Sequence, residues 1–194
     1  MKSSQRLHYR PVMPGDEEDL QGIFGDPEVM RFSLSGAKSP EEIRQYIKET
    51  WVHHPTGTGQ WLMILRDSGL VAGVCGFFSF EHRGNRELEI SYRLKPPFWG
   101  QGLATEAALA LVEHAESRLS CRRLYGVVDP DNGASAEVLR KVGLLPEGDL
   151  EYHGRRLHVY GMTLRRGPGI PDEELIHEGP MTGREVRMMI LGLL

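Results

Sequence analysis

The sequence predicts an α/β (α+β) domain, in which a mixed, mostly antiparallel central sheet is flanked by helices. Strand patterns gather in the middle of the chain and are joined by short glycine-containing turns, which is typical of an antiparallel meander. Helix patterns precede and follow this meander. A last strand, helix and hairpin pattern completes the expected domain.

Composition bounds the class of protein. The chain has 194 residues, 40% of them hydrophobic and 26% charged, as in an ordinary single globular domain. A net charge of −4 gives no basic excess for a phosphate backbone, so we expect no nucleic-acid partner. We expect neither a membrane span of ~18 apolar residues nor a signal peptide, and therefore a cytoplasmic protein. The spacing of the cysteines and histidines predicts neither a disulfide framework nor a metal site.

The first third of the chain reads as a strand followed by helices. Residues 6–10 form the strand candidate, residues 13–24 a helix with acids in its first turn, and residues 26–32 a short helical turn. The helix predicted over 39–51 begins with a capping box, in which Ser39 is the N-cap and Glu42 the third helical residue.

Strands are predicted over 59–67, 70–80 and 86–94. The third strand alternates strictly, so that its side chains divide between two faces. One face carries Leu88, Ile90, Tyr92 and Leu94, and the other Glu87, Glu89, Ser91 and Arg93.

The rest of the domain follows in the same way. We expect a helix over roughly 101–118, a strand over 122–128, a helix capped by Asn132 that ends at Gly143, and a hairpin that turns near residues 153–154. From about Gly167 the composition changes to a Pro/Gly-rich linker and a short apolar segment. This divides the chain into a domain of residues 1–166 and a C-terminal extension of residues 167–194. The extension either covers its own domain or contacts a second copy, so the protein is a monomer or a homodimer through this segment.

The stretch PPFWGQGLATEA, residues 96–107, carries the first chemical signal. Two prolines end a strand, two glycines free the backbone, and a helix begins at once. A helix N-terminus with unpaired N–H groups binds anions, and such a loop would fit a pyrophosphate. The alternative is a glycine-rich corner that only packs Trp99. A P-loop motif is absent, and a GxGxxG fingerprint that began at Gly100 would need a glycine where Thr105 stands.

The second signal is VVDPDNGASAEVLRKVGL, residues 127–144. By itself it describes a well-capped helix, with Asn132 as N-cap, Ser135 three residues later and Gly143 after its end.

The order of these features resembles the GNAT superfamily of acyl-CoA-dependent N-acetyltransferases over roughly residues 6–165. It is closest to the branch that includes the ribosomal-protein alanine/serine N-acetyltransferases. The resemblance rests on YRPVMPGDEEDLQGIFGDPEVMRF, ELEISYRLKPPFWGQGLATEA and NGASAEVLRKVGL. It implies a GNAT-type sheet that is splayed for acetyl-CoA. The superfamily loop pattern Q/R-x-x-G-x-G/A falls on Trp99, Gly102 and Ala104, with Trp99 departing from the broad pattern.

The resemblance also implies a cofactor site. The loop N–H groups would bind the pyrophosphate, the backbone of Ser91–Arg93 would pair with the pantetheine arm, and Asn132 would hydrogen-bond that arm. The implied acetyl-CoA contacts are Ser91, Tyr92, Arg93, Trp99, Gly100, Gln101, Gly102, Leu103, Ala104, Thr105, Asn132 and Ser135.

Acetyl transfer to an amine needs a base for the amine and a proton for the leaving thiolate. Glu89 is the predicted base, acting through water, with Glu87 as the second candidate; both could instead be surface carboxylates that pair with Arg86 or Arg93. The Tyr that many superfamily members use as proton source is replaced by Leu139, so Ser135 or a water is expected in that role.

The predicted function is N-acetyltransfer from acetyl-CoA to a primary amine, by direct transfer in a ternary complex. Neither Cys75 nor Cys121 shows the surroundings of an acyl-enzyme nucleophile. The acceptor is either a protein N-terminal α-amine or a small amine. Two alternatives remain open: a non-catalytic acyl-CoA-binding or regulatory module on the same fold, and a different nucleotide-binding fold.

Overall fold

A computed structural model describes residues 1–51, 53, 56–152 and 154–165, with the backbone alone at residue 51. It confirms the predicted fold class, since one seven-stranded sheet runs in the order β1-β2-β3-β4-β5-β7-β6. The strands are β1 Leu7–Pro11, β2 Gln60–Leu65, β3 Val71–His82, β4 Asn85–Leu94, β5 Arg123–Val128, β6 Leu145–Tyr152 and β7 Arg155–Thr163. The helices are α1 Glu17–Phe24, α2 Pro40–Trp51, α3 Leu103–Arg118 and α4 Gly133–Lys141, with the short 3-10 turn η2 at Pro96–Phe98. The predicted extension, residues 167–194, lies outside the described residues.

Strands β1 to β4 form the predicted antiparallel meander. The β3–β4 hairpin is tight because Arg83 and Gly84 both take left-handed backbone angles, with φ of 51° and 79°. On the other side of the sheet, β5 pairs with β7 and β7 with β6, all antiparallel. Among the described residues, the two halves of the sheet pair where β4 runs parallel to β5, with Glu89 opposite Tyr125.

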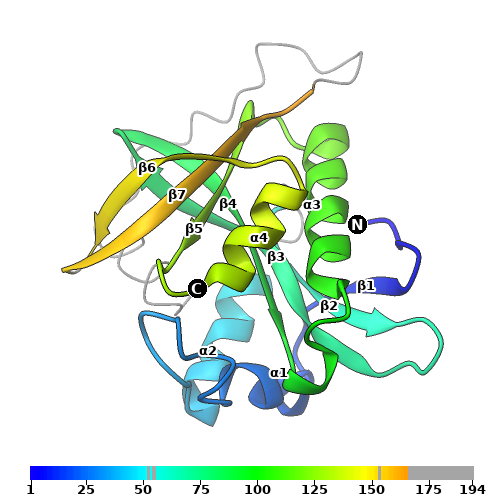
Figure 1. The fold of residues 1–194 in the computed structure, drawn as a ribbon. Helices are drawn as coiled ribbons and strands as arrows, with labels where there is room; N and C mark the ends of the chain where they lie inside the picture. The colour runs from blue at the N-terminus through cyan, green and yellow to red at the C-terminus, as the bar shows by residue number, and fades with distance from the viewer. Residues whose placement is uncertain (52, 54–55, 153, 166–194) are drawn as a thin grey trace.

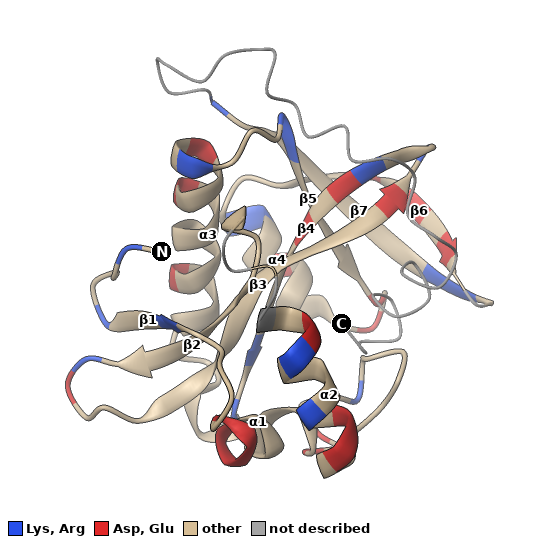
Figure 2. Ribbon diagram, turned by 180° about the vertical axis from the view of Figure 1, so that it is seen from behind, with Lys and Arg blue, Asp and Glu red and all other residues tan. Residues whose placement is uncertain are grey.

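The helices cover the sheet on two faces (Figure 1, Figure 2). Helices α3 and α4 pack on one face with a large apolar cluster that includes Ile90, Leu111 and Leu124. Helices α1 and α2 pack on the opposite face, over β2 and β3, with a second cluster that includes Phe24 and Tyr46. Each face of β4 therefore meets a different pair of helices.

One predicted helix boundary was wrong. Helix α3 begins at Leu103, not near Gln101, because Gly102 has a φ of 77° that a right-handed helix cannot include. Residues 26–32 form the short turn that was predicted, in which the N–H of Met30 donates to the carbonyl of Asp26 at 3.0 Å. The carboxylate of Asp26 caps this turn by accepting the N–H groups of Glu28 and Val29.

The predicted caps are confirmed. Ser39 Oγ accepts from the N–H of Glu42 at 3.3 Å, and the Glu42 carboxylate accepts from the N–H of Ser39 at 2.7 Å. Asn132 caps α4, and Gly143 follows its end with a φ of 96°. In the described part of the chain, no helix combines the length and the apolar character that a membrane crossing requires.

Leu139 lies in the core rather than at a surface. It is 1% exposed, and a Cβ added at Gly126 of β5 would lie 2.6 Å from Leu139 Cδ1. Strand and helix approach this closely because Gly126 has no side chain. The residue that stands where the resemblance would place a tyrosine is therefore a packing residue.

We predict that Leu139→Ala lowers the free energy of unfolding by about 2–5 kcal/mol, since it leaves a cavity. Leu139→Tyr is expected to destabilise by about 1–3 kcal/mol, because the ring exceeds the space over Gly126. Urea denaturation followed by circular dichroism measures both. Leu109→Ala, at an exposed position of α3, is the control and should change little. A Leu139→Tyr protein as stable as the parent would contradict this packing.

Candidate active site

The candidate site begins where β4 and β5 separate. Beyond the pair of Glu89 and Tyr125, the next N–H of β5, that of Val127, donates to Glu89 Oε1 at 3.2 Å instead of to the backbone of β4. Strand β4 stays paired with β3 along its whole length, up to Leu94. Its other edge, from Ile90 to Leu94, has no described strand beside it, so its backbone groups are available to an extended ligand.

The loop after β4 leads directly from this edge to a helix N-terminus. Gly100 and Gly102 both have left-handed angles, with φ of 72° and 77°. The first bond of α3 runs from the N–H of Glu106 to the carbonyl of Gly102, so the N–H groups of Leu103, Ala104 and Thr105 have no intrahelical acceptor. Unpaired N–H groups at the positive end of a helix dipole are the features on which the predicted anion site depends, and the site itself stays a prediction.

Trp99 fastens the loop to the strand. Its indole Nε1–H donates to the carbonyl of Leu94 at 2.7 Å, and its side chain is 43% exposed. The tryptophan therefore holds the end of β4 against the loop, while Gln101 donates its side-chain amide to the carbonyl of Pro97 at 2.9 Å.

Two residues near the N-terminus of the chain, Ser4 and Arg6, also contact the loop and the first turn of α3. Arg6 donates from Nη1 to the carbonyl of Gln101 at 2.8 Å and from Nε to Glu106 at 2.7 Å. Ser4 Oγ donates to the same carboxylate at 2.7 Å. No local pattern in the sequence links Arg6 with Glu106, because the two residues lie 100 positions apart.

Helix α4 brings its N-terminus to β4. The Asn132 side chain accepts from the N–H of Ser135 at 3.1 Å, which leaves the Asn132 amide NH₂ free to donate. The Tyr92 hydroxyl lies 3.1 Å from both the carbonyl oxygen and the Oγ of Ser135. Alternation had placed Tyr92 correctly on the face of Ile90, but only the fold shows that this face carries a tyrosine hydroxyl beside Ser135.

Glu89 faces the other side of the sheet, opposite Phe78 of β3. Burial raises the pKa of its carboxyl to about 7, although the hydrogen bond from Val127 and the charge of Arg93 both lower it. A carboxyl with that pKa is ionised in part at neutral pH and can accept a proton there.

Glu87 is the weaker candidate on the same face. It lies opposite Phe80, one step further from the open edge of β4. Burial raises its pKa, Arg123 lowers it and Glu147 raises it. Its charged neighbours are therefore those of the β5–β6 side, not those of the open edge.

Successive side chains of β4 point to opposite faces of the sheet, so the open edge is lined from two sides. Glu89, Ser91 and Arg93 face α1 and α2, whereas Tyr92 faces the N-terminus of α4. A group held along the open edge would thus meet a proton acceptor on one side and hydroxyl donors on the other. This arrangement suits acyl transfer with separate base and acid.

Neither cysteine fits a nucleophile. Cys75 is fully buried, and burial raises the pKa of its thiol far above neutrality. Burial also raises the pKa of Cys121 to about 11, so both remain protonated at neutral pH.

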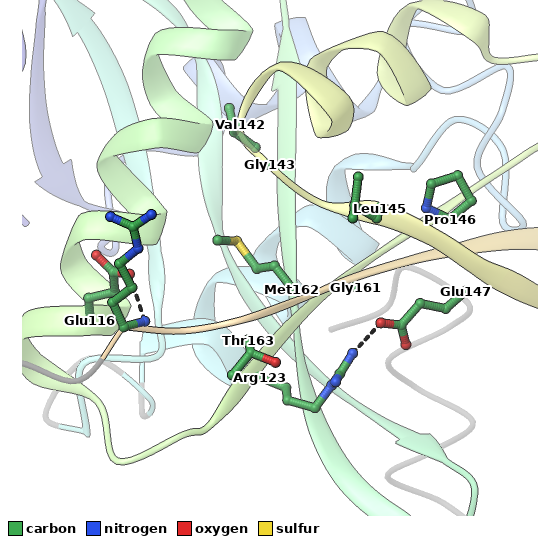
Figure 3. A pocket seen from close by; sticks show the side chains of 11 residues that line it. Glu116, Arg123, Val142, Gly143, Leu145, Pro146, Glu147, Gly161, Met162 and Thr163 are labelled. Carbon is green, nitrogen blue, oxygen red and sulfur yellow. Dashed lines mark hydrogen bonds and ion pairs between the residues drawn. The ribbon is translucent and has the colours of Figure 1, made fainter.

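A surface cavity of about 710 Å³ lies elsewhere, between the C-terminal half of α3 and the β5–β6–β7 sheet (Figure 3). The ion pair of Arg123 and Glu147 spans part of its wall. None of the predicted site residues is among its lining residues, so the cavity is separate from the candidate site. Among the described residues, no group of three or more His, Cys, Asp and Glu side chains could hold a metal ion.

Comparison with known proteins gives a consistent result. Residues 6–145 match the family model of the acetyltransferase (GNAT) domain. The chain is 30% identical to the uncharacterized protein YkkB of Bacillus subtilis, over 81% of this chain and 92% of the relative. It is 25% identical to the spermidine N(1)-acetyltransferase of Escherichia coli K12, over 77% and 78% of the two chains. The solved structure of RimL, a ribosomal L7/L12 alpha-N-protein acetyltransferase in complex with coenzyme A, superposes with a TM-score of 0.70 at 26% identity, over 83% of this chain and 96% of that one.

Proposed function

The chain belongs to the GNAT acetyltransferase family and is an acyltransferase, and from this premise we propose that it moves an acetyl group from acetyl-CoA to a primary amine. The acceptor is a protein N-terminal α-amine or a small-molecule amine, and transfer is direct, within a ternary complex. The observation that carries this proposal is the open edge of β4, which runs from Glu89 to the anion site at the start of α3.

The residues at this edge fit acetyl-CoA. The pyrophosphate would accept hydrogen bonds from the N–H groups at the start of α3, where Gly102 allows a close approach of the backbone. The pantetheine arm would pair with the backbone of Ser91–Arg93 in the manner of an added strand, and the free amide of Asn132 would donate to it. A relative in this family, RimL, has been solved with coenzyme A.

Bound acetyl-CoA supplies a thioester carbon that an uncharged amine can attack. Glu89 takes the proton that the amine must lose, directly or through a water, so that the nitrogen has a lone pair for the new C–N bond. The C–S bond breaks as the C–N bond forms, and the electron pair leaves with sulfur.

The leaving thiolate needs a proton or a hydrogen bond on the α4 side. The Ser135 hydroxyl supplies it, and Tyr92 holds that hydroxyl by a contact of 3.1 Å. Burial raises the pKa of Tyr92, while its contact with Ser135 lowers it. Tyr92 is thus neutral at physiological pH and orients Ser135, whose hydroxyl takes the role that Leu139 cannot fill.

The net charge of −4 favours amine acceptors over nucleic acid. We place the protein in the cytoplasm, and we assign residues 167–194 either to a cover on the same domain or to a homodimer contact.

Glu89→Gln is expected to lower kcat/KM by about 100-fold, because it removes the base. In the parent protein kcat/KM should rise as pH increases through about 7, since the raised pKa of Glu89 keeps the carboxyl protonated below that pH. The variant should lose this step and keep only the titration of the acceptor amine. Release of free thiol from acetyl-CoA measures both, against panels of N-terminal peptides and small amines. Acetyl-CoA binding without turnover on any acceptor would favour a non-catalytic binding module instead.

Ser135→Ala should lower kcat by about 10-fold or more, if its hydroxyl assists the leaving thiolate. Tyr92→Phe should give a smaller loss, because it removes only the group that orients Ser135. Single-turnover kinetics at saturating acetyl-CoA separate this loss from weaker binding. Nearly full kcat in Ser135→Ala would limit Ser135 to the cap of α4.

Gly102→Ala and Gly84→Ala form a matched pair, because their φ angles are 77° and 79° and a Cβ meets no close neighbour at either position. Each should cost about 1–2 kcal/mol of stability, as expected for an alanine in the left-handed region. Only Gly102→Ala should also weaken acetyl-CoA, by about 10-fold, as measured by titration calorimetry. Equal acetyl-CoA affinities in the two variants would contradict a pyrophosphate site at this loop.

A further inference from the structure

A group of buried polar atoms without partners lies on the α1/α2 face of the sheet. Lys38, just before the N-cap of α2, is 3% exposed, and its Nζ has no hydrogen-bond partner. Glu49 of α2 adds a further unpartnered atom, Oε2, and the buried hydroxyl of Tyr46 lies beside Thr50 on the same helix. Buried polar groups are nearly always hydrogen-bonded, so unpaired ones in one place call for a partner.

Arg93 of β4 extends into the same region. Its guanidinium lies over the ring of Phe24, at 5.5 Å from the ring centroid, and its charge interacts with Tyr46 and Glu89. No described residue forms a hydrogen bond or an ion pair with this guanidinium. An arginine has a planar fork of donors that suits a carboxylate, and here the fork has no acceptor.

The two cations are close enough to repel each other. Burial lowers the pKa of Lys38 to about 8; Glu42 and Glu49 raise it, and Arg93 lowers it. Glu42 is engaged by the N-terminus of α2, and Glu49 accepts from Gln45 through Oε1 at 2.5 Å. The acids of α2 therefore leave both the ammonium and the guanidinium without a direct partner, which is costly for the buried ammonium of Lys38 above all.

This group adjoins the proposed base. Ser91 lies between Glu89 and Arg93 on the same face of β4, and it donates to the side chain of Gln60 at 3.5 Å. Gln60 can cross the sheet to this point because Gly76, between the two strands, has no side chain. An acceptor whose amine lies at Glu89 would therefore extend along β4, past Ser91, toward the guanidinium of Arg93 and the ammonium of Lys38.

We propose that the acceptor is a primary amine that also carries a carboxylate a few bonds away, which Arg93 and Lys38 bind while the amine faces Glu89. The inference deepens the proposed acetyltransferase function and rests on it. A polyamine would instead bring further positive charge beside the buried Lys38 and the half-buried Arg93, and this would oppose its binding. Two sources share this chemistry: a free amino acid, and a peptide whose first residue has an acidic side chain.

The first test compares acceptors in matched pairs. Each α-amino acid is assayed against its own amide, and peptides beginning with Asp or Glu against those beginning with Asn or Gln, with spermidine as the cationic acceptor. In the pair that represents the natural acceptor, we expect kcat/KM to be about 10- to 100-fold higher for the carboxylate than for its amide. This is the gain expected from a charge-assisted hydrogen bond. The pair that shows the preference identifies the source. Equal rates within every pair, or a preference for spermidine, would overturn the proposal.

The second test changes the cations. Lys38→Gln should raise KM for the carboxylate acceptor about 10-fold or more, with little change for its amide, so that the preference falls. Arg93→Gln should lower the same preference, measured as the ratio of kcat/KM within each pair. Arg93→Lys retains the charge and should keep part of the preference. Lys48→Gln, at an exposed position of α2, is the matched control. The preference should also decline as pH rises through about 8, where Lys38 loses its proton.

A binding measurement separates this inference from the proposed reaction. An N-acetylated amino acid cannot react again, so its affinity for the CoA-saturated protein is measured by calorimetry beside that of its amide. Tighter binding of the carboxylate, lost in Lys38→Gln, supports the anion site even if no acceptor is turned over. Binding of the carboxylate that is no tighter than that of the amide overturns the anion site, whatever amine the enzyme acetylates. Thermal melting of each variant confirms that it is folded.

Discussion

The single parallel contact between β4 and β5 is the constraint on which the rest of the site depends. At Glu89 and Tyr125 the strands are paired, and two residues later along β5 the side chain of Glu89 accepts the N–H of Val127. A carboxylate oxygen there satisfies a backbone donor that the separating strand would otherwise leave unpaired. The same residue thus closes the last paired position of the sheet and stands at the start of the open edge.

The open edge of β4 ends at a helix N-terminus, which makes its two ends chemically different. Beyond Leu94 the prolines of η2 stop the strand, and Trp99 ties the turn back to the strand end. Two left-handed glycines then present the first N–H groups of α3, while Arg6 holds the loop from outside. A ligand with an extended arm and an anionic end therefore finds hydrogen bonds for the arm and positive potential for the end.

Burial on the α1/α2 face changes the pKa values of Glu89 and Lys38. Lys38 is buried there, and the half-buried guanidinium of Arg93 lies over the ring of Phe24 in the apolar cluster. Desolvation raises the pKa of Glu89 and lowers that of Lys38, so both groups titrate near neutrality. In the proposed reaction, proton transfer and the choice of acceptor therefore depend on the same face of the sheet.

Local sequence was sufficient for most of the elements and for the glycine turn that leads into α3. Strict alternation predicted the two faces of β4, Ser39 and Asn132 predicted helix starts, and glycines predicted the turn at the start of α3, because each depends on backbone geometry within a few residues. The start of α3 was misplaced by two residues, since only the left-handed angle of Gly102 excludes it from the helix.

The contacts of the site required the tertiary structure. Tyr92 meets Ser135 across 43 positions, Arg6 meets Glu106 across 100, and Lys38 approaches Arg93 from a different element. No periodicity encodes such pairs, because they arise from where β4 and β5 separate and from which helices cover each face. The pattern of residues established which chemical groups the chain carries; the fold decided which of them share one dry space, and so which protons they can exchange at neutral pH.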